Sequence, residues 1–170
     1  MTVALEQPHP PRLKKWTKEE YLDLVERGAF DQQRVYLFRG DIIERAPHGH
    51  PHAYGITVLG RYLMDTLPKP YMVRIQCSFI TPGRSVPEPD AAVCTAEDAM
   101  RRPHPSHAEL IVEVADSSLK VDRRKAAEYA AAQVPEYWII NRADGRSRCT
   151  GGRSKMRKLR LVTATPRCAC

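Results

Sequence analysis

The chain has 170 residues, enough for one domain with its own core, and a formal net charge of +7. The excess lies at one end. Residues 142–170 hold nine lysines and arginines and one acid, whereas residues 1–141 hold 18 basic and 19 acidic residues. The C-terminal stretch therefore has the charge to bind phosphate, while the charge of the remaining domain argues neither for nor against nucleic acid.

The composition also excludes several classes of protein. No apolar run approaches the roughly 18 residues of a membrane helix, so we expect no membrane partner. The first residues lack the basic and apolar segments of a secretory signal, and we expect a cytoplasmic protein. The five cysteines are odd in number and contain no C-x-x-C pair, which argues against a disulfide framework and a zinc knuckle.

The domain is predicted to occupy residues 16–145. Residues 1–15 contain several prolines and little apolar pattern, which predicts a flexible arm. The domain then opens with a helix, because Thr17 and Glu20 form the pattern of a capping box and Gly28 ends the apolar stripe.

The remaining elements are predicted from apolar periodicity, prolines and turn residues. They are a β-hairpin with strands at 35–38 and 42–44, helices at 53–67 and 121–132, and strands at 72–80, 90–94, 110–115 and 137–140. The last helix lies between two apolar strands and makes a β-α-β unit. This order predicts an α/β fold, a mixed β-sheet flanked by helices.

The pattern changes after Gly145. Residues 146–170 are basic, and only 159–162 have strand character, so we predict an irregular basic tail. Two hypotheses account for this tail. It is either a genuine basic segment or the product of a shifted reading frame, and resequencing the gene distinguishes them.

Two acids in strand-like segments are the first candidates for chemistry. Asp90 follows Pro87-Glu88-Pro89, and Glu113 lies within Leu110-Ile111-Val112-Glu113-Val114. A buried carboxylate is costly unless it is paired or binds a metal. Two such acids, with the carbonyl oxygen of Val114, suit Mg²⁺ and phosphodiester chemistry. Spacing alone favours the structural alternative, in which Asp90 caps a turn and Glu113 pairs with a base.

Lys125 is the third candidate. On a helix that begins near Val121, positions 121, 125 and 129 share one face, so Lys125 lies on the apolar side between Val121 and Tyr129. An inward lysine is unusual unless it reaches an acid, and its ammonium can activate water and stabilise charge on phosphate. The alternative is a side chain that extends to solvent.

Three histidines alternate in a loop rich in proline and glycine. His48, His50 and His52 have the side chains to bind a transition metal, but such a loop fixes no geometry, which favours solvated or locally bonded rings. His52 also opens a predicted helix, where backbone N–H groups can bind phosphate.

Seven segments together resemble the putative restriction endonuclease family found in many copies in bacterial genomes, part of the PD-(D/E)XK nuclease superfamily. They run from Trp16 to about Gly145: Trp16-Thr17-Lys18-Glu19-Glu20-Tyr21, Gly40-Asp41-Ile42-Ile43-Glu44, His52, Val86-Pro87-Glu88-Pro89-Asp90, Leu110-Ile111-Val112-Glu113-Val114-Ala115-Asp116-Ser117-Ser118, Asp122-Arg123-Arg124-Lys125 and Val134-Pro135-Glu136-Tyr137-Trp138-Ile139-Ile140.

The resemblance implies a restriction-endonuclease-like core and a Mg²⁺-dependent endonuclease that hydrolyses DNA. Asp90 matches the Pro-Asp half of the motif and Glu113 its second acid, so both are expected to bind Mg²⁺. Ala115 stands where the motif places its lysine, and Lys125 in the next helix is the matching candidate. We expect DNA as the nucleic-acid partner and a homodimer as the assembly.

Two departures from the family pattern concern the hairpin. Tyr36 stands where the family commonly has a glutamate, and Arg39 where an acid often precedes the turn glycine. A second hypothesis is a catalytically silent module of the same fold that binds nucleic acid through its tail. A third hypothesis is a damaged gene product without function.

Overall fold

The structure is a computed structural model that describes residues 12–115, 118–141 and 146–151. Its centre is a five-stranded sheet in the order β3-β4-β5-β6-β7. The strands are β3 (Tyr71–Ile75), β4 (Ala91–Thr95), β5 (Leu110–Ala115), β6 (Glu136–Asn141) and β7 (Arg146–Gly151). Only β5 and β6 are parallel, joined by a helix as predicted, and the other neighbours are antiparallel. The predicted α/β class with a mixed sheet is confirmed.

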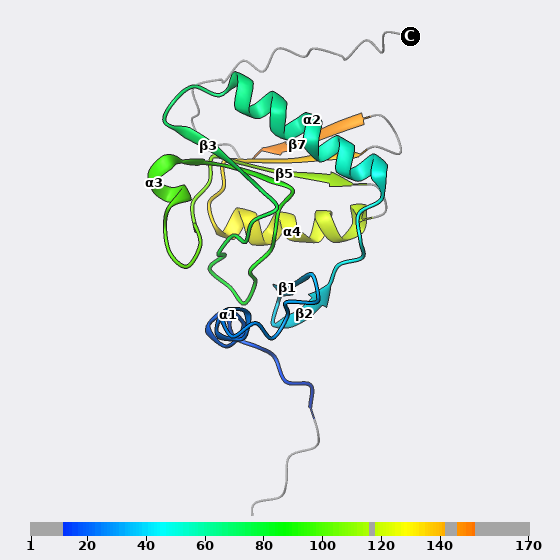
Figure 1. Ribbon diagram of the computed structural model, residues 1–170, viewed down its shortest axis with the longest axis vertical. Coiled ribbons are helices and arrows are strands. Elements are labelled where there is room, and N and C mark those ends of the chain that lie inside the picture. Colours follow the sequence, from blue (N-terminus) through cyan, green and yellow to red (C-terminus); the bar gives the residue numbers. More distant parts are fainter. Residues whose placement is uncertain (1–11, 116–117, 142–145, 152–170) are drawn as a thin grey trace, which may run out of the picture.

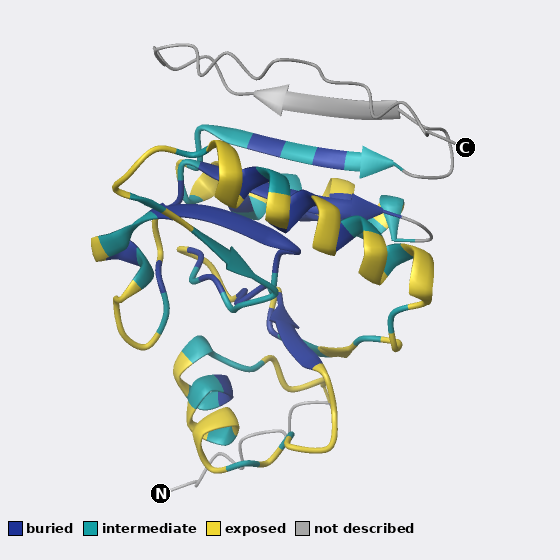
Figure 2. Cartoon of the chain, turned by 45° about the horizontal axis from the view of Figure 1, so that its top comes forward, coloured by how far each residue is buried: buried dark blue, intermediate teal, exposed yellow. Residues whose placement is uncertain are grey.

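Two helices cover opposite faces of this sheet, α2 (His50–Thr66) and α4 (Leu119–Ala131) (Figure 1). Alternate side chains of each strand point to opposite faces, so the sheet contributes to two cores. One core joins Leu59 and Leu63 of α2 to Val112 of β5, and the other joins Tyr129 of α4 to Ile111. Figure 2 shows β4 and β5 buried between the layers, while the outer side of α2 is exposed.

A smaller unit lies beyond α4 and contains α1 (Lys18–Glu26), β1 (Val35–Phe38) and β2 (Asp41–Glu44) (Figure 1). The capping box predicted for α1 is present. Arg39 and Gly40 form a two-residue hairpin turn with φ of 53° and 82°, the positive values that such turns require. The amide of Val86 donates to the Leu37 carbonyl at 2.8 Å, which attaches the hairpin to the segment before Asp90.

The structure departs from the predicted elements in three places, each for a local reason. The strand predicted at 72–80 ends at Ile75, because Gln76 takes a positive φ of 50° and turns the chain. Helix α2 begins at His50, earlier than predicted, since Pro51 is tolerated in the first turn. The strand predicted at 90–94 is followed by a short helix that was not predicted, α3 (Ala96–Ala99), whose first turn is capped by the hydroxyl of Thr95.

The prediction of an irregular tail from residue 146 was wrong for Arg146–Gly151, which form β7. This strand pairs with β6 in register from Asn141↔Arg146 to Glu136↔Gly151. Main-chain hydrogen bonds supply that pairing, and an edge strand does not need the alternating apolar side chains on which the prediction depended. Residues 152–170 and most of the predicted N-terminal arm lie outside the described residues. Among those described, no helix has the length and apolar character of a membrane span.

Candidate active site

The two predicted acids face the same side of the sheet. In β5, Ile111 belongs to the core beneath α4, so Glu113, two residues later, points to that side as well. In β4, Ala92 belongs to the same core, and Asp90 precedes it by two residues. The alternation of the strands thus aims Glu113 towards α4, and Asp90 lies just before β4 in the same alternation.

The register between β4 and β5 also brings the acids together along the strands. Ala91 pairs with Val112, and one further step in that antiparallel register sets Asp90 opposite Glu113. At this point the backbone N–H of Val114 donates a 2.8 Å hydrogen bond to Asp90 Oδ2. The Asp90 carboxylate therefore accepts a hydrogen bond that a backbone carbonyl of the neighbouring strand would otherwise accept. The Val114 amide fixes the orientation of this carboxylate.

The second oxygen of Asp90 faces three nitrogen-bearing side chains. Arg45 Nη2 and Gln76 Nε2 each lie 3.4 Å from Asp90 Oδ1, and His52 Nε2 lies 3.6 Å from it. These contacts are longer than the 2.7–2.9 Å expected of charge-assisted hydrogen bonds. Asp90 is 1 % exposed, so the guanidinium of Arg45 matters for its charge.

Glu113 is held by two donors from α4. Lys125 Nζ donates to Glu113 Oε1 at 3.0 Å, and the Tyr129 hydroxyl donates to the same oxygen at 2.9 Å. Lys125 is 4 % exposed, so its predicted inward orientation is confirmed and it does not extend to solvent. The structural alternative for Glu113, pairing with a base, is present together with the predicted convergence on Lys125.

The charge states of this pair follow from burial and from neighbouring charges. Burial raises the pKa of Glu113 to about 7, reinforced by the negative charges of Asp90 and Asp122 against the opposing effect of Lys125. Burial lowers the pKa of Lys125, but Glu113 and Asp122 outweigh it and raise that pKa above its ordinary value. The ammonium therefore stays protonated, and Glu113 is the group that titrates near neutral pH.

Asp122 was not predicted as a site residue and appeared only in the segment Asp122-Arg123-Arg124-Lys125, but the structure gives it a direct role. Asp122 Oδ1 accepts from Lys125 Nζ at 3.2 Å, and Asp122 Oδ2 accepts from the Ser118 hydroxyl at 2.5 Å. The Tyr137 hydroxyl donates to the Asp122 carbonyl at 2.8 Å, which fixes this turn of α4 against β6. The spacing of three residues between Asp122 and Lys125 was the available signal.

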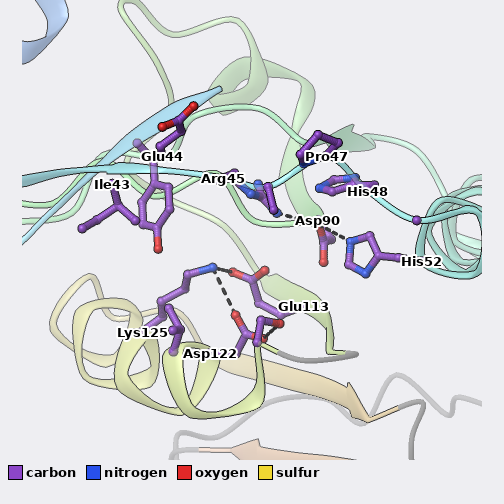
Figure 3. Close-up of a pocket in the computed structure, with 15 residues that line it drawn as sticks. Ile43, Glu44, Arg45, Pro47, His48, His52, Asp90, Glu113, Asp122 and Lys125 are labelled. Atoms are coloured by element: carbon purple, nitrogen blue, oxygen red, sulfur yellow. Dashed lines mark hydrogen bonds and ion pairs between the residues drawn. The ribbon is translucent and has the colours of Figure 1, made fainter. Parts of the chain in front are cut away.

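These groups line one cavity of about 300 Å³ between the hairpin, the start of α2, the sheet and α4 (Figure 3). Figure 3 shows Lys125 reaching from α4 to Glu113, with Arg45 and Asp90 on the opposite wall. The lining residues are Tyr36, Ile43, Glu44, Arg45, Ala46, Pro47, His48, Gly49, His52, Asp90, Glu113, Ser118, Val121, Asp122 and Lys125. Asp90, Glu113 and Lys125 thus meet in one cavity, whereas Val114 does not line it.

Two of the three loop histidines reach this cavity. The rings of His48 and His52 meet edge to face with centroids 4.4 Å apart, and His48 Nδ1 lies 3.1 Å from Gln76 Nε2. His50 is exposed, so the three imidazoles do not converge. The favoured interpretation, locally bonded rings, describes His48.

The donor set of the cavity fits a hard divalent cation such as Mg²⁺. Both hydrogen bonds that Glu113 accepts from described residues end on Oε1, which leaves Oε2 without a donor there. From the residues that the structure describes, Asp90 Oδ1 receives only the long contacts noted above. No group of three His, Cys, Asp or Glu side chains suited to a metal occurs in the described part of the chain. Mg²⁺ needs only one or two carboxylates, because water and substrate phosphate complete its shell.

The family model described as putative restriction endonuclease (Uma2) matches residues 18–161, most of the chain. The chain belongs to this family. The match extends beyond Gly145, where the resemblance in sequence was expected to end.

A crystal structure of a "putative nuclease belonging to DUF820" from Anabaena variabilis resembles the chain with a TM-score of 0.67. The two sequences are 12 % identical, and the alignment covers 82 % of this chain and 81 % of that chain. At this identity the likeness shows the fold alone. No curated protein matches the chain.

Tyr36, the expected departure from the restriction endonuclease family, lies in the wall of the cavity. Its ring centroid is 5.4 Å from Lys125 Nζ, so a phenol faces the ammonium at the position where the resemblance led us to expect a glutamate. Glu44, on the partner strand of the hairpin, also lines the cavity and is exposed. The hairpin therefore still presents one acid to the site, from a different strand.

The raised pKa of Glu113 predicts a pH dependence of stability in the metal-free protein. A folded pKa of about 7, above the ordinary 4.5, means that the folded state retains a proton between those values. This contribution to stability is full below pH 4.5 and is lost as the pH rises through 7. The free energy of unfolding of the wild type, relative to Glu113→Gln, should fall by a few kcal/mol from about pH 5 to about pH 8. Urea titrations in EDTA measure it, and a constant difference would contradict the raised pKa.

Proposed function

We propose that the protein is a Mg²⁺-dependent endonuclease that hydrolyses DNA phosphodiester bonds. The observation that carries this proposal is the convergence of Asp90, Glu113 and Lys125 in one cavity, with both acids buried. Family membership supports a nuclease, and the cavity supplies the oxygen ligands and the cation that such a reaction needs.

Asp90 and Glu113 are the residues that would hold Mg²⁺, since each keeps one carboxylate oxygen that accepts no short hydrogen bond from the described residues. A bound Mg²⁺ lowers the pKa of water and stabilises charge on phosphate oxygens. The Val114 amide fixes the orientation of Asp90, and the Tyr129 hydroxyl fixes that of Glu113. Both acids are therefore held in place by hydrogen bonds that leave one oxygen of each for a ligand.

Lys125 acts as a donor in this proposal. Because Glu113 and Asp122 keep its ammonium protonated, it cannot accept the proton of the attacking water. It orients Glu113, and its positive charge at the edge of the cavity stabilises negative charge that develops on the phosphate. The Asp122 carboxylate, three residues earlier in α4, binds the Lys125 ammonium and fixes its position.

Substitutions in the cavity test this function. Asp90→Ala and Glu113→Ala should each abolish Mg²⁺-dependent nicking of plasmid DNA, and Lys125→Met should slow it by about 10²–10³-fold. Asp98→Asn is a matched control, because Asp98 is also a buried acid but lies in α3 at the other end of β4, where its carboxylate accepts from the Thr95 hydroxyl. Nicking that is equal in the wild type, Asp90→Ala and Glu113→Ala would refute the site.

A second candidate function is a silent nucleic-acid-binding module. Tyr36 favours it, since the cavity has a phenol at the position of the family's usual glutamate, and so does the basic C-terminal sequence. This function predicts binding of DNA without turnover.

The basic residues after β7 provide the test of that module. Deletion after Gly145 would remove β7, so substitution is preferable. Changing Arg153, Lys155, Arg157, Lys158, Arg160 and Arg167 to glutamine should abolish DNA binding if the module hypothesis holds, and the salt dependence should flatten. If the enzyme hypothesis holds, Mg²⁺-dependent nicking persists in this variant.

A further inference from the structure

Arg45 is the cavity residue whose chemistry the proposed function has not used. It follows the last residue of β2, and its backbone N–H donates to the Arg34 carbonyl at 2.7 Å, which fixes the main chain. Its guanidinium then reaches the segment before β4. Nη1 donates to the Glu88 carbonyl at 3.1 Å, and Nη2 lies 3.4 Å from Asp90 Oδ1. The side chain is 14 % exposed and lines the cavity.

Among the described residues, Lys125 and Arg45 are the strong cations that line this cavity. They differ in how many of their N–H donors have an acceptor. Lys125 is buried, and its ammonium is shared between Glu113 and Asp122 at 3.0 and 3.2 Å. Arg45 has five N–H donors. Its carboxylate contacts are single and long, 3.4 Å to Asp90 and 3.8 Å to Glu88 Oε2, and no bond from its Nε occurs in the described part of the chain. Arg45 therefore has more uncommitted donors than Lys125, two of whose three N–H groups already serve Glu113 and Asp122.

The charge of the cavity makes such a cation necessary. Within the described part of the chain, four carboxylates line it, those of Glu44, Asp90, Glu113 and Asp122. A phosphodiester carries a negative charge and would be repelled at short range in a partly desolvated site. A planar guanidinium binds two phosphate oxygens at once, which a carboxylate-bound ammonium cannot do.

We propose that Arg45 binds a phosphate of the nucleic-acid substrate, and that in the free protein the same guanidinium neutralises Asp90. This inference rests on the proposed function, since it assumes a phosphodiester in the cavity. It explains why the contacts between Arg45 and the two acids are long and single, with neither acid gripping the guanidinium in a two-point pair. Arg45 is a substrate-binding residue, distinct from the acids that would hold the metal.

Binding of a short fluorescein-labelled DNA duplex, measured by anisotropy with Mg²⁺ present, tests this role. All variants carry Glu113→Gln, which keeps Arg45 and Asp90 while preventing cleavage. Adding Arg45→Met should weaken binding about tenfold or more and reduce the slope of log affinity against log salt by about one. Arg45→Lys should keep the slope but bind more weakly than the parent, because it loses the planar fork.

Arg61→Met is the matched control, since Arg61 is an exposed arginine of α2 paired with Asp65 and outside the cavity. It should change neither affinity nor slope. If Arg45→Met binds like Arg61→Met, or if the parent binds no DNA, the inference is overturned. If Arg45→Met does not fold, Arg45→Lys decides, and binding equal to the parent overturns the inference.

Cleavage by the wild type, measured separately, distinguishes this inference from the proposed function. A wild type that does not cleave, with binding that still depends on Arg45, would refute the nuclease and leave the phosphate-binding role supported. A wild type that cleaves, with an unchanged Arg45→Met, would refute only the role of Arg45.

Discussion

The rest of the site depends on one interaction, the buried ion pairs that the Lys125 ammonium makes with Glu113 and Asp122. A charge in such a place is tolerated only because its partners are close, and removing one partner costs about 3–5 kcal/mol. The pair joins α4 to the central strand β5. It therefore fixes the distance between the helix and the sheet, and with it the depth of the cavity. The same contacts that stabilise this layer keep Lys125 charged and shift the titration of Glu113.

The second half of the site depends on the end of an antiparallel ladder. Asp90 comes one residue before β4, and there the Val114 amide donates to its carboxylate oxygen in place of a β4 carbonyl. The hairpin supplies Arg45 across this gap, so each acid is accompanied by one cation. The cation beside Glu113 comes from α4, and the cation beside Asp90 is Arg45, the residue that follows β2. The cavity between them is acidic overall, which suits a divalent ion and requires a further positive group for phosphate.

Much of this architecture could be predicted from local sequence. Thr17 and Glu20 predicted the start of α1, and helical periodicity placed Lys125 inward, because both signals depend on neighbours within one turn. The contact between Arg45 and Asp90 spans 45 positions and depends on how the hairpin packs, which no local pattern records. The positive φ of Gln76 could not be predicted from the residue types around it. Strand β7 was missed because its pairing uses the backbone, while its sequence is polar.

The central claim is that Asp90 and Glu113 hold one divalent ion beside Lys125. The most direct measurement is a crystal structure of the full chain soaked in Mn²⁺, an oxygen-binding substitute for Mg²⁺ that anomalous scattering locates. We expect one strong peak that lies within bonding distance of a carboxylate oxygen of Asp90 and also of a carboxylate oxygen of Glu113. A peak that touches only one of these acids, or no peak in the cavity, would contradict it.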